Sequence, residues 1–417
     1  MINPSLALLM AALLSPAAAL SQDTNPRDNE RPAHPASAAL MLPAPPGCAL
    51  VGNPGAPPLS PATAPAEFLP AQLEVRTPFE PTAFPSGGRN YLIYELHLRN
   101  LAGEPMELQG IEVIGGDGFA RPIVTFDAKQ LASLFFPRAH ALSSEESEAS
   151  RRLDSAQASV AYVCLAFEPS VAVPSQLRHR VLLKDIYAEG PAIGTRHGRL
   201  RTLAPPVAGP DWVAAGGPGN TSHHRVGLLV IGGNARISRR YAIDWRQVRN
   251  QATFEGEAID ARSYHAYGET VFAVADGLVV SARDGLPDNV PRTPKGFQTA
   301  LPLTMDNVAG NTVTLDLGGG HFALYAHLKP GSVSVRKGDR VKRGQALGRI
   351  GNSGDSREPH LHFEVMDSPD LLAGEGLPYL IDRYETRSDD GGVHPRVDEL
   401  PMLEMRVDFR SAEALSD

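Results

Sequence analysis

The chain is poor in several features that would place it in a familiar class. Only two of its 417 residues are cysteines, which excludes a dense disulfide framework and allows at most one bridge. Acidic residues outnumber basic ones by 47 to 39, for a formal net charge of -8, and no basic aromatic cluster offsets this balance. Nucleic acid is therefore excluded as a partner. Past the N-terminus no apolar run reaches the length of a membrane span, which excludes an integral membrane protein.

The N-terminus has the form of a secretory signal. An apolar run over residues 6–14 is followed by Pro16 and by small residues at 17–19, the pattern of a cleavage site. At about ten residues the run is too short to span a bilayer. No Lys or Arg precedes it, so a buried N-terminal helix remains as the alternative. We predict a signal peptide and an exported protein, located in the periplasm or outside the cell.

Composition divides the rest of the chain into segments. Residues 23–68 hold eleven prolines and ten alanines with few large apolar residues, which predicts an extended tether without a core. Alternating strands at 90–100 and 159–167, split by turn residues, predict a small β-sandwich, and 190–219 is rich in Gly and Pro. The predicted boundaries are signal peptide 1–21, tether 22–68, sandwich 69–189, linker 190–219, second β domain 220–385 and tail 386–417.

The sandwich contains no cluster of catalytic residue types, and we interpret it as a spacer or docking module. Cys48 lies in the tether and Cys164 in a sandwich strand. Two cysteines in an exported chain can form one disulfide that pins the tether to the sandwich, but Cys164 could equally be a buried free thiol.

Two histidines in an apolar strand are the most informative feature. In 359–365 (PHLHFEV), His360 and His362 fall on one face of a strand, while the residues between and after them face a core. Same-face side chains stand roughly 7 Å apart, so one imidazole can bind a metal while the other acts on a water beside it. Segment 321–328 repeats the alternation, with His321, Tyr325 and His327 predicted on one face.

A lone carboxylate, Asp244, interrupts the apolar strand 241–245 (YAIDW). An unpaired buried charge is costly unless it meets a cation, and zinc is a suitable partner. The alternative is a structural ion pair between Asp244 and Arg240 or Arg246.

Four motifs follow one another along the second half of the chain. They are 268–279 (GETVFAVADGLV), 325–328 (YAHL), 338–345 (GDRVKRGQ) and 360–364 (HLHFE). In this order they resemble the lysostaphin-like (LytM-type) zinc endopeptidases, which cut peptide bonds in bacterial peptidoglycan. The resemblance implies an all-β protein in which a β-sandwich precedes a C-terminal LytM-type domain, a duplicated hybrid motif of barrel-sandwich form.

The resemblance also implies roles for single residues. Asp244 and His362 would be metal ligands, His360 the general base and His327 the stabiliser of the transition state. The family's first metal histidine is replaced by Arg240, which cannot ligate zinc because its guanidinium stays protonated. We expect a hairpin, with strands at 224–231 and 236–245, to bring a substitute opposite Asp244.

The substitute ligand is predicted to be His224, because residues 220–225 and 240–244 look like a branch of the family with a His-Arg pair before the hairpin. A shift of one residue in register would place His223 there instead. The expected cofactor is zinc, and the expected substrates are peptidoglycan stem or cross-bridge peptides, with a cell-envelope protein as a further candidate partner. The alternative is a catalytically degenerate LytM-type module that binds and regulates other cell-wall hydrolases.

Overall fold

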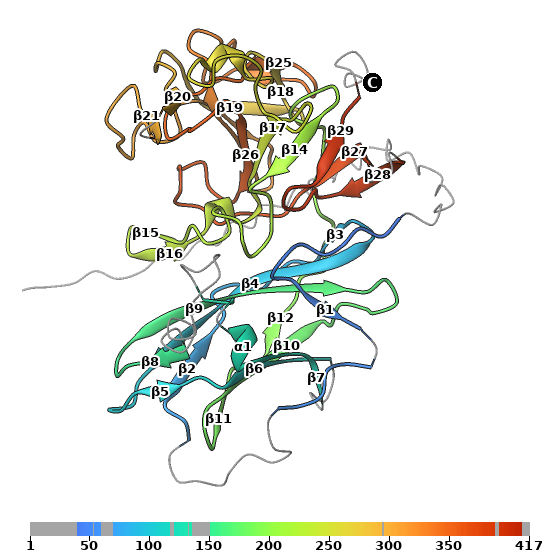
Figure 1. Ribbon diagram of the computed structural model, residues 1–417, viewed down its shortest axis with the longest axis vertical. Helices are drawn as coiled ribbons and strands as arrows, with labels where there is room; N and C mark the ends of the chain where they lie inside the picture. Colours follow the sequence, from blue (N-terminus) through green and yellow to red (C-terminus); the bar gives the residue numbers. More distant parts are fainter. Residues whose placement is uncertain are drawn as a thin grey trace, which may run out of the picture. The chain divides into compact units, whose positions relative to one another are not determined.

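The computed structural model describes residues 40–52, 54–59, 70–116, 121–131, 133–135, 151–293, 296–387 and 392–410. These residues form one compact unit built almost wholly of β-strands (Figure 1). Its α-helix, α1 (Ala128–Leu131), has four residues, and in the described ranges no helix is long and apolar enough to cross a membrane. The all-β prediction is therefore confirmed, while the predicted signal peptide lies outside the described residues.

The N-terminal domain is a sandwich of two five-stranded sheets. The first has the order β1-β9-β4-β2, with β3 beside β4, from the strands β1 (Ala49–Val51), β2 (Leu73–Arg76), β3 (Phe84–Ser86), β4 (Arg89–Asn100) and β9 (Ala158–Phe167). The second has the order β11-β10-β6-β7, with β12 beside β10, from β6 (Gly110–Gly115), β7 (Pro122–Asp127), β10 (Gln176–Leu182), β11 (Tyr187–Glu189) and β12 (Ile193–Gly194). A short pair joins β5 (Met106–Glu107) to β8 (Arg152–Leu153).

The first sheet of the sandwich is buried on both faces. Leu92 and Tyr94 of β4 pack in the core between the two sheets. Tyr91 and Ile93, on the opposite face of the same strand, belong to the core of the C-terminal domain. Residues 90–100 were predicted to alternate between a buried and an exposed face, but most of them are buried. A second domain covers the face that would otherwise meet solvent.

Part of the predicted tether belongs to the sandwich. Strand β1 pairs in parallel with β9, and Cys48 forms a disulfide with Cys164. The prediction of an extended tether is wrong for this segment, because the apolar residues 48–51 (CALV) supply an edge strand in an otherwise Pro-rich stretch. The open question about the two cysteines is settled in favour of the bridge.

Acid should destabilise the sandwich through His179. This histidine is 1% exposed, its Nε2 atom lies 2.9 Å from the Tyr94 hydroxyl, and burial lowers its pKa to about 3. Between that value and the ordinary pKa the unfolded chain binds a proton that the folded chain does not, so stability falls as the pH falls. From pH 7 to pH 5 we expect His179 to contribute a loss of about 2 kcal/mol.

Urea unfolding at both pH values checks this expectation. His179→Gln should remove this contribution to the loss of stability between pH 7 and pH 5. The same substitution at the exposed His197 should leave the pH dependence of stability as it is in the parent protein. An unchanged pH dependence in His179→Gln would contradict the assignment.

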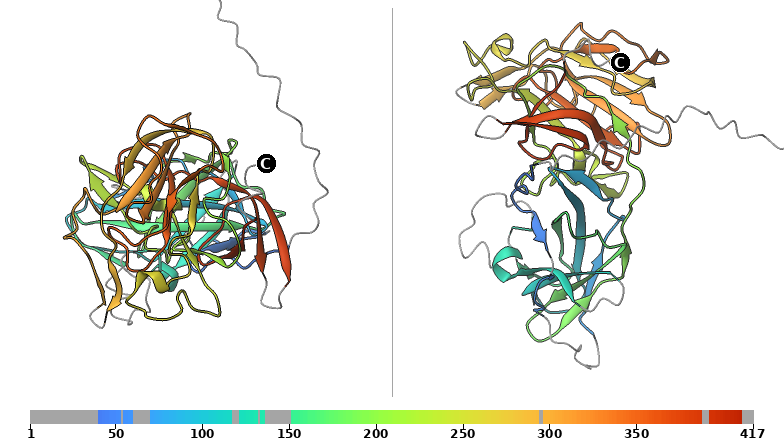
Figure 2. Two further views of the ribbon diagram at one scale, coloured as in Figure 1. Left: turned by 90° about the horizontal axis from the view of Figure 1, so that it is seen from above. Right: turned by 90° about the vertical axis from the view of Figure 1, so that its right-hand side faces the viewer.

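The C-terminal domain is built on a sheet of eleven strands, with the order β13-β27-β29-β14-β17-β26-β23-β22-β19-β24 and β28 beside β27. These are β13 (Thr202–Leu203), β14 (Trp212–Ala215), β17 (Ile243–Gln247), β19 (Gly277–Arg283), β22 (Asn311–Asp316), β23 (Phe322–Leu328), β24 (Arg340–Val341), β26 (Leu361–Met366), β27 (Leu380–Arg387), β28 (Val393–Glu399) and β29 (Arg406–Asp408). Both views of Figure 2 show β27 and β28 side by side in red.

Three further pairs of strands lie outside this sheet, joining β15 (Leu229–Ile231) to β16 (Asn234–Arg236), β18 (Thr270–Phe272) to β25 (Ala346–Arg349) and β20 (Val290–Thr293) to β21 (Gly296–Gln298). Two 3₁₀ turns complete the described elements, η1 (Ser238–Tyr241) and η2 (Ala261–Ser263).

The predicted linker and tail are parts of the C-terminal sheet. Strand β14, inside the predicted linker, pairs with β17 on one side and β29 on the other. Strands β28 and β29 lie inside the predicted tail. Both boundaries are wrong, because Trp212 and Ala214 are buried with Val407 and Phe409 in the core of the domain. Strand β14 is buried at all four positions and β28 and β29 at one position each, so none of them shows the alternation by which a strand is recognised in a sequence.

The predicted hairpin exists but is shorter than expected. Its strands β15 and β16 turn at Gly232 and Gly233, which both have positive φ, as a two-residue hairpin turn requires. The chain then enters η1, and Asp244 lies on the separate strand β17. The hairpin therefore does not reach Asp244, and the prediction that it supplies the cross-strand ligand is wrong.

Candidate active site

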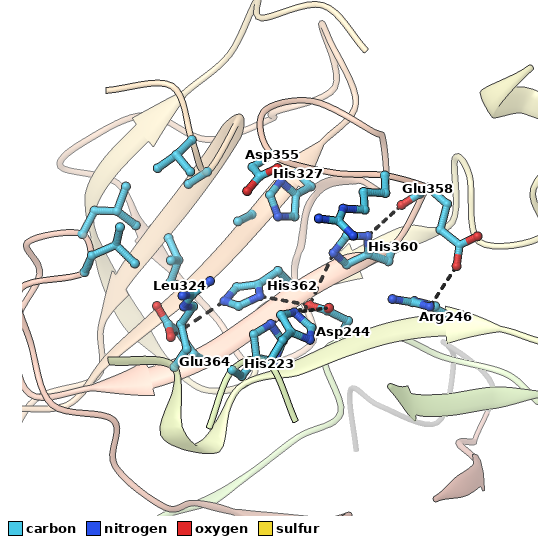
Figure 3. Close-up of a pocket in the computed structure, with 18 residues that line it drawn as sticks. His223, Asp244, Arg246, Leu324, His327, Asp355, Glu358, His360, His362 and Glu364 are labelled. Carbon is cyan, nitrogen blue, oxygen red and sulfur yellow. Dashed lines mark hydrogen bonds and ion pairs between the residues drawn. The ribbon is translucent and has the colours of Figure 1, made fainter. Parts of the chain in front are cut away.

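The two histidines of the His-x-His segment lie at the start of β26. Leu361, Phe363 and Val365 belong to the hydrophobic core, which confirms the predicted alternation. His360, directly before the strand, and His362 instead line a cavity of about 360 Å³ (Figure 3). The period of the strand thus places two imidazoles side by side at one cavity wall.

Asp244 lies on β17 directly opposite His362. The two residues pair in register across antiparallel strands, and His362 Nδ1 lies 3.0 Å from Asp244 Oδ1. The carboxylate is buried, and its ion-pair partners within the described residues are all histidines. Neither Arg240 nor Arg246 is among them, since Arg246 pairs with Glu358. The alternative of a structural ion pair with either arginine is therefore wrong.

His224 reaches Asp244 from a loop rather than from the predicted hairpin. Its Nε2 atom lies 3.3 Å from Asp244 Oδ1, and only 3% of its side chain is exposed. The neighbouring His223 places Nε2 3.6 Å from Asp244 Oδ2 but leaves 61% of its side chain exposed. In the described residues these three form a group whose ligand atoms all lie within 4.8 Å of one another. Both histidines left open by the sequence thus reach the carboxylate, and His224 is the buried one.

His327 lines the same cavity because β23 is bulged near its end. The pairing of β23 with β22 shifts register there, which gives β23 one extra residue, and His327 adopts a φ of 63°. Tyr325 faces the core instead, where its hydroxyl accepts a hydrogen bond from the Val274 amide. The prediction that His321, Tyr325 and His327 share a face is wrong, because strict alternation does not survive an inserted residue.

Three of the imidazoles direct Nδ1 at a backbone carbonyl oxygen, in the pairs His224 with Gly216 (2.8 Å), His327 with Ser353 (2.8 Å) and His360 with Glu358 (2.7 Å). A carbonyl oxygen only accepts, so Nδ1 carries the hydrogen and the neutral ring keeps a lone pair at Nε2. In His224 and His360 that Nε2 lies 3.3 Å from Asp244 Oδ1. These rings therefore present acceptor nitrogens, which can bind a metal or take a proton.

Burial and neighbouring charges set the ionisation of the site. Burial lowers the pKa of His224 and of His327. Burial also opposes ionisation of Asp244, but the imidazoles around it, His224 first, outweigh this effect and hold its pKa well below the usual range. Burial would lower the pKa of His362, but hydrogen bonds to Asp244 and Glu364 raise it to about 9. The cavity thus combines an ionised carboxylate with imidazoles at His224 and His327 that burial keeps neutral, while its hydrogen bonds favour the charged form of His362.

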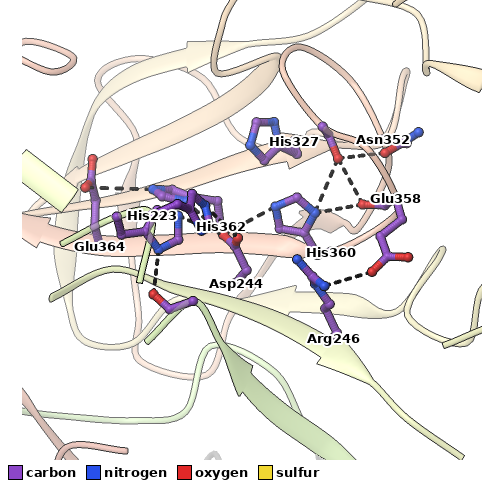
Figure 4. Close-up of polar contacts among 12 residues, drawn as sticks. His223, Asp244, Arg246, His327, Asn352, Glu358, His360, His362 and Glu364 are labelled. Carbon is purple, nitrogen blue, oxygen red and sulfur yellow. Dashed lines mark hydrogen bonds and ion pairs between the residues drawn. The ribbon is translucent and has the colours of Figure 1, made fainter. Parts of the chain in front are cut away.

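The sequence reasoning missed the polar residues that orient His360. The Glu358 backbone oxygen holds the ring, and the Glu358 carboxylate pairs with Arg246 at 2.9 Å (Figure 4). Beside them Ser356 Oγ donates to Asn352 Oδ1 at 2.6 Å. Asn352, Ser356 and Glu358 all lie within the eight residues before His360, so the polar segment ahead of the His-x-His strand was the signal that could have revealed them.

Arg240 does not line the cavity. It is 2% exposed, and its guanidinium pairs with Glu95 of the sandwich at 2.9 Å and with Glu375 at 2.8 Å. A second buried arginine, Arg225, pairs with the same Glu95. The arginine found where the resemblance expects a metal histidine therefore links two domains.

Residues 257–372 match peptidase family M23, a segment that includes His327, His360 and His362. The C-terminal domain is a peptidase family M23 domain. In this M23 domain His224 and Asp244 lie before the matched segment and join it only through the fold.

Several known proteins are similar to parts of the chain. The peptidoglycan DD-endopeptidase ShyA of Vibrio cholerae is 41% identical over 133 residues, which are 31% of this chain and 27% of ShyA. The cell division protein DipM of Caulobacter vibrioides is 35% identical over 94 residues, 22% of this chain and 15% of DipM. The solved catalytic domain of lysostaphin from Staphylococcus simulans is 24% identical, covers 40% of this chain and 88% of that domain, and has a TM-score of 0.22. The match thus spans less than a third of either curated relative.

The donor atoms of the M23 domain suit zinc, on which this family depends. Zinc in proteins takes imidazole nitrogen and carboxylate oxygen, and catalytic sites keep one position for water or substrate. The cavity brings such donors together around Asp244, a buried carboxylate that no Lys or Arg neutralises in the described part of the chain. A bound cation would offset the cost of burying that charge.

Proposed function

We propose that this protein is an exported zinc metalloendopeptidase that hydrolyses peptide bonds in peptidoglycan cross-links. One observation carries the proposal: a single cavity collects His224, Asp244 and His362 together with two further imidazoles, His327 and His360. The peptidoglycan substrate is supported by the match to M23 and by the similarity to ShyA, which is named a peptidoglycan endopeptidase.

His224, Asp244 and His362 would hold the zinc. His362 and Asp244 face each other on adjacent strands, and His224 approaches the same carboxylate oxygen from the loop. Bound zinc would polarise the scissile carbonyl and lower the pKa of a water molecule in its open position. His223 is the candidate that competes with His224, and its exposure makes it the weaker ligand, because a mobile side chain must be ordered on binding.

His360 is the proposed general base. With Nδ1–H held by the Glu358 carbonyl, its Nε2 is free to accept the proton of the attacking water. His327, whose Nδ1–H is held by Ser353, can likewise only accept at Nε2 while neutral. This favours orientation of the attacking water by His327 over donation to the oxyanion.

Export fits the covalent structure. The Cys48–Cys164 disulfide is of a kind that persists in oxidising compartments, which supports a location in the periplasm or outside the cell. The expected partners are peptidoglycan stem or cross-bridge peptides, with a cell-envelope protein as a further candidate. A catalytically degenerate binding module remains the second candidate, and the substitution at Arg240 is the observation that favours it.

Zinc content tests the proposal directly. Elemental analysis of the full chain should find about one zinc per molecule, and His224→Ala should lose it because a buried ligand is removed. His223→Ala, at the adjacent histidine, should keep its zinc and serves as the control. Release of soluble peptides from purified peptidoglycan should follow the zinc content. A parent protein that binds no added zinc would point to the binding module.

Arg240→His should leave zinc affinity unchanged. The side chain at this position pairs with Glu95 and Glu375 and does not line the cavity, so a histidine there has no route to Asp244. Competition with a chromophoric chelator measures the zinc affinity. Arg236→His on β16 is the control, since it adds a histidine at another position outside the cavity. Tight zinc binding found only in Arg240→His would mean that the natural site is degenerate.

A further inference from the structure

We propose that the N-terminal sandwich is a positioning element of the metal site, because it fixes the loop that carries His224. This inference rests on the proposed function. The loop, residues 216–228, lies between β14 and β15 and contains no strand in the described structure. Residues 216 and 218 of the loop bond to Glu404 and Leu403 of the C-terminal domain, and side chains inserted against the sandwich hold the loop on both sides of His224.

Arg225 is the first of these anchors and follows His224 directly. Its side chain is fully buried. Nη2 donates to the backbone oxygens of Tyr94 at 2.8 Å and Val163 at 3.3 Å, on strands β4 and β9 of the sandwich. Nη1 forms an ion pair with Glu95. The residue next to the proposed ligand is therefore fixed by three groups that all belong to the other domain.

Asn220 is the second anchor, at the opposite side of the histidines. It is 6% exposed, and its Nδ2 donates to the backbone oxygens of Tyr162 at 2.7 Å and Gly47 at 3.1 Å. Gly47 precedes Cys48, whose disulfide ties this segment to β9. The loop is thus held at residues 220 and 225, with His223 and His224 between the two points.

The peptidase sheet positions the other proposed ligands without this help. Asp244 and His362 are cross-strand neighbours, so the pairing of β17 with β26 sets their distance. His224 lies on no strand; its ring is held by the Gly216 oxygen within the same loop, so any freedom left in the loop backbone would have to be lost when the metal binds. Contacts with the sandwich remove that freedom in advance. Partners that orient a metal ligand typically contribute 10–100-fold to affinity.

Asn220→Ala tests the inference in the full chain. It removes both donations to the sandwich while leaving every proposed ligand in place. We expect zinc affinity, measured by chelator competition, to fall by about 10–100-fold. The visible absorption of the cobalt-substituted protein should change as well, since it reports the ligand geometry. Arg225→Gln, which removes the ion pair with Glu95, should have the same effect on both readouts.

The matched control is Asn100→Ala. Asn100 is also buried in the sandwich and donates from Nδ2 to backbone oxygens, those of Glu104 and Leu153, but does not touch the loop. It should lower the thermal stability and leave zinc affinity and the cobalt spectrum unchanged. Unchanged affinity in folded Asn220→Ala, or an equal loss in Asn100→Ala, would overturn the inference while the proposed function stands. A parent protein without zinc affinity would overturn both.

Discussion

His360→Ala is expected to abolish peptidoglycan hydrolysis while the protein keeps its zinc. His360 Nε2 faces the site, and Nδ1–H is anchored on the Glu358 oxygen, which leaves Nε2 as an acceptor that can take a proton from the attacking water. Loss of a general base typically lowers the rate by about 10²–10⁴-fold. The loss should appear in kcat, measured as the release of peptides from purified peptidoglycan at saturating substrate.

Zinc content separates the possible roles of His360. Elemental analysis of the purified variant should still give about one zinc per chain. His321→Ala is the matched control, because His321 is not among the residues that line the cavity and its Nδ1 donates to the oxygen of the nearby Gly319. If zinc disappears together with activity in His360→Ala, then His360 is a ligand and the roles of His360 and His362 have been assigned wrongly.

Glu95→Gln should destabilise the protein by about 3–5 kcal/mol, the cost of leaving buried charges without their partner. Glu95 is 1% exposed and pairs with two buried guanidinium groups, those of Arg225 and Arg240. A neutral amide would leave one of these cations uncompensated, because Glu375 can serve only Arg240. Urea unfolding followed by circular dichroism measures the loss.

Glu80→Gln is the control for the Glu95 experiment. Glu80 belongs to the same domain and pairs with Arg196 at 3.3 Å, but both side chains are more than half exposed. Exposed pairs contribute about 0–1 kcal/mol, so this variant should stay close to the parent protein. Similar losses in the two variants would contradict a special role for the buried network. A second, separate unfolding transition in Glu95→Gln would show that the pair couples the two domains.

Local periodicity predicted the parts of the site that lie on regular strands. The two-residue period of β26 was enough to place His360 and His362 on the cavity side and Phe363 in the core. The same rule gave the wrong face for Tyr325, because the bulge in β23 changes the alternation before His327. A bulge is set by how two strands pair, and the sequence of one strand does not contain that information.

The domain boundaries failed for a related reason. Strands β1, β14 and β29 are each only three or four residues long, and β1 and β14 lie in segments rich in Pro or Gly. Their stability comes from neighbours far away in the sequence, such as β9 for β1. Composition indicated a tether, a linker and a tail, but pairing with distant strands makes each of them part of a sheet.

The sequence by itself determined the features on which the proposed chemistry rests: the order of the histidine motifs, the single carboxylate among apolar residues and the strand that carries His360 and His362. These features are local, since residue type and a period of two suffice to express them. The tertiary structure decided how His224 reaches the site and why Arg240 stays out of it. The first depends on the contact of Arg225 with Tyr94, which is 131 residues away along the chain. The second depends on the contact of Arg240 with Glu95, which is 145 residues away. Such contacts follow from the packing of two domains, which no local pattern in the sequence contains.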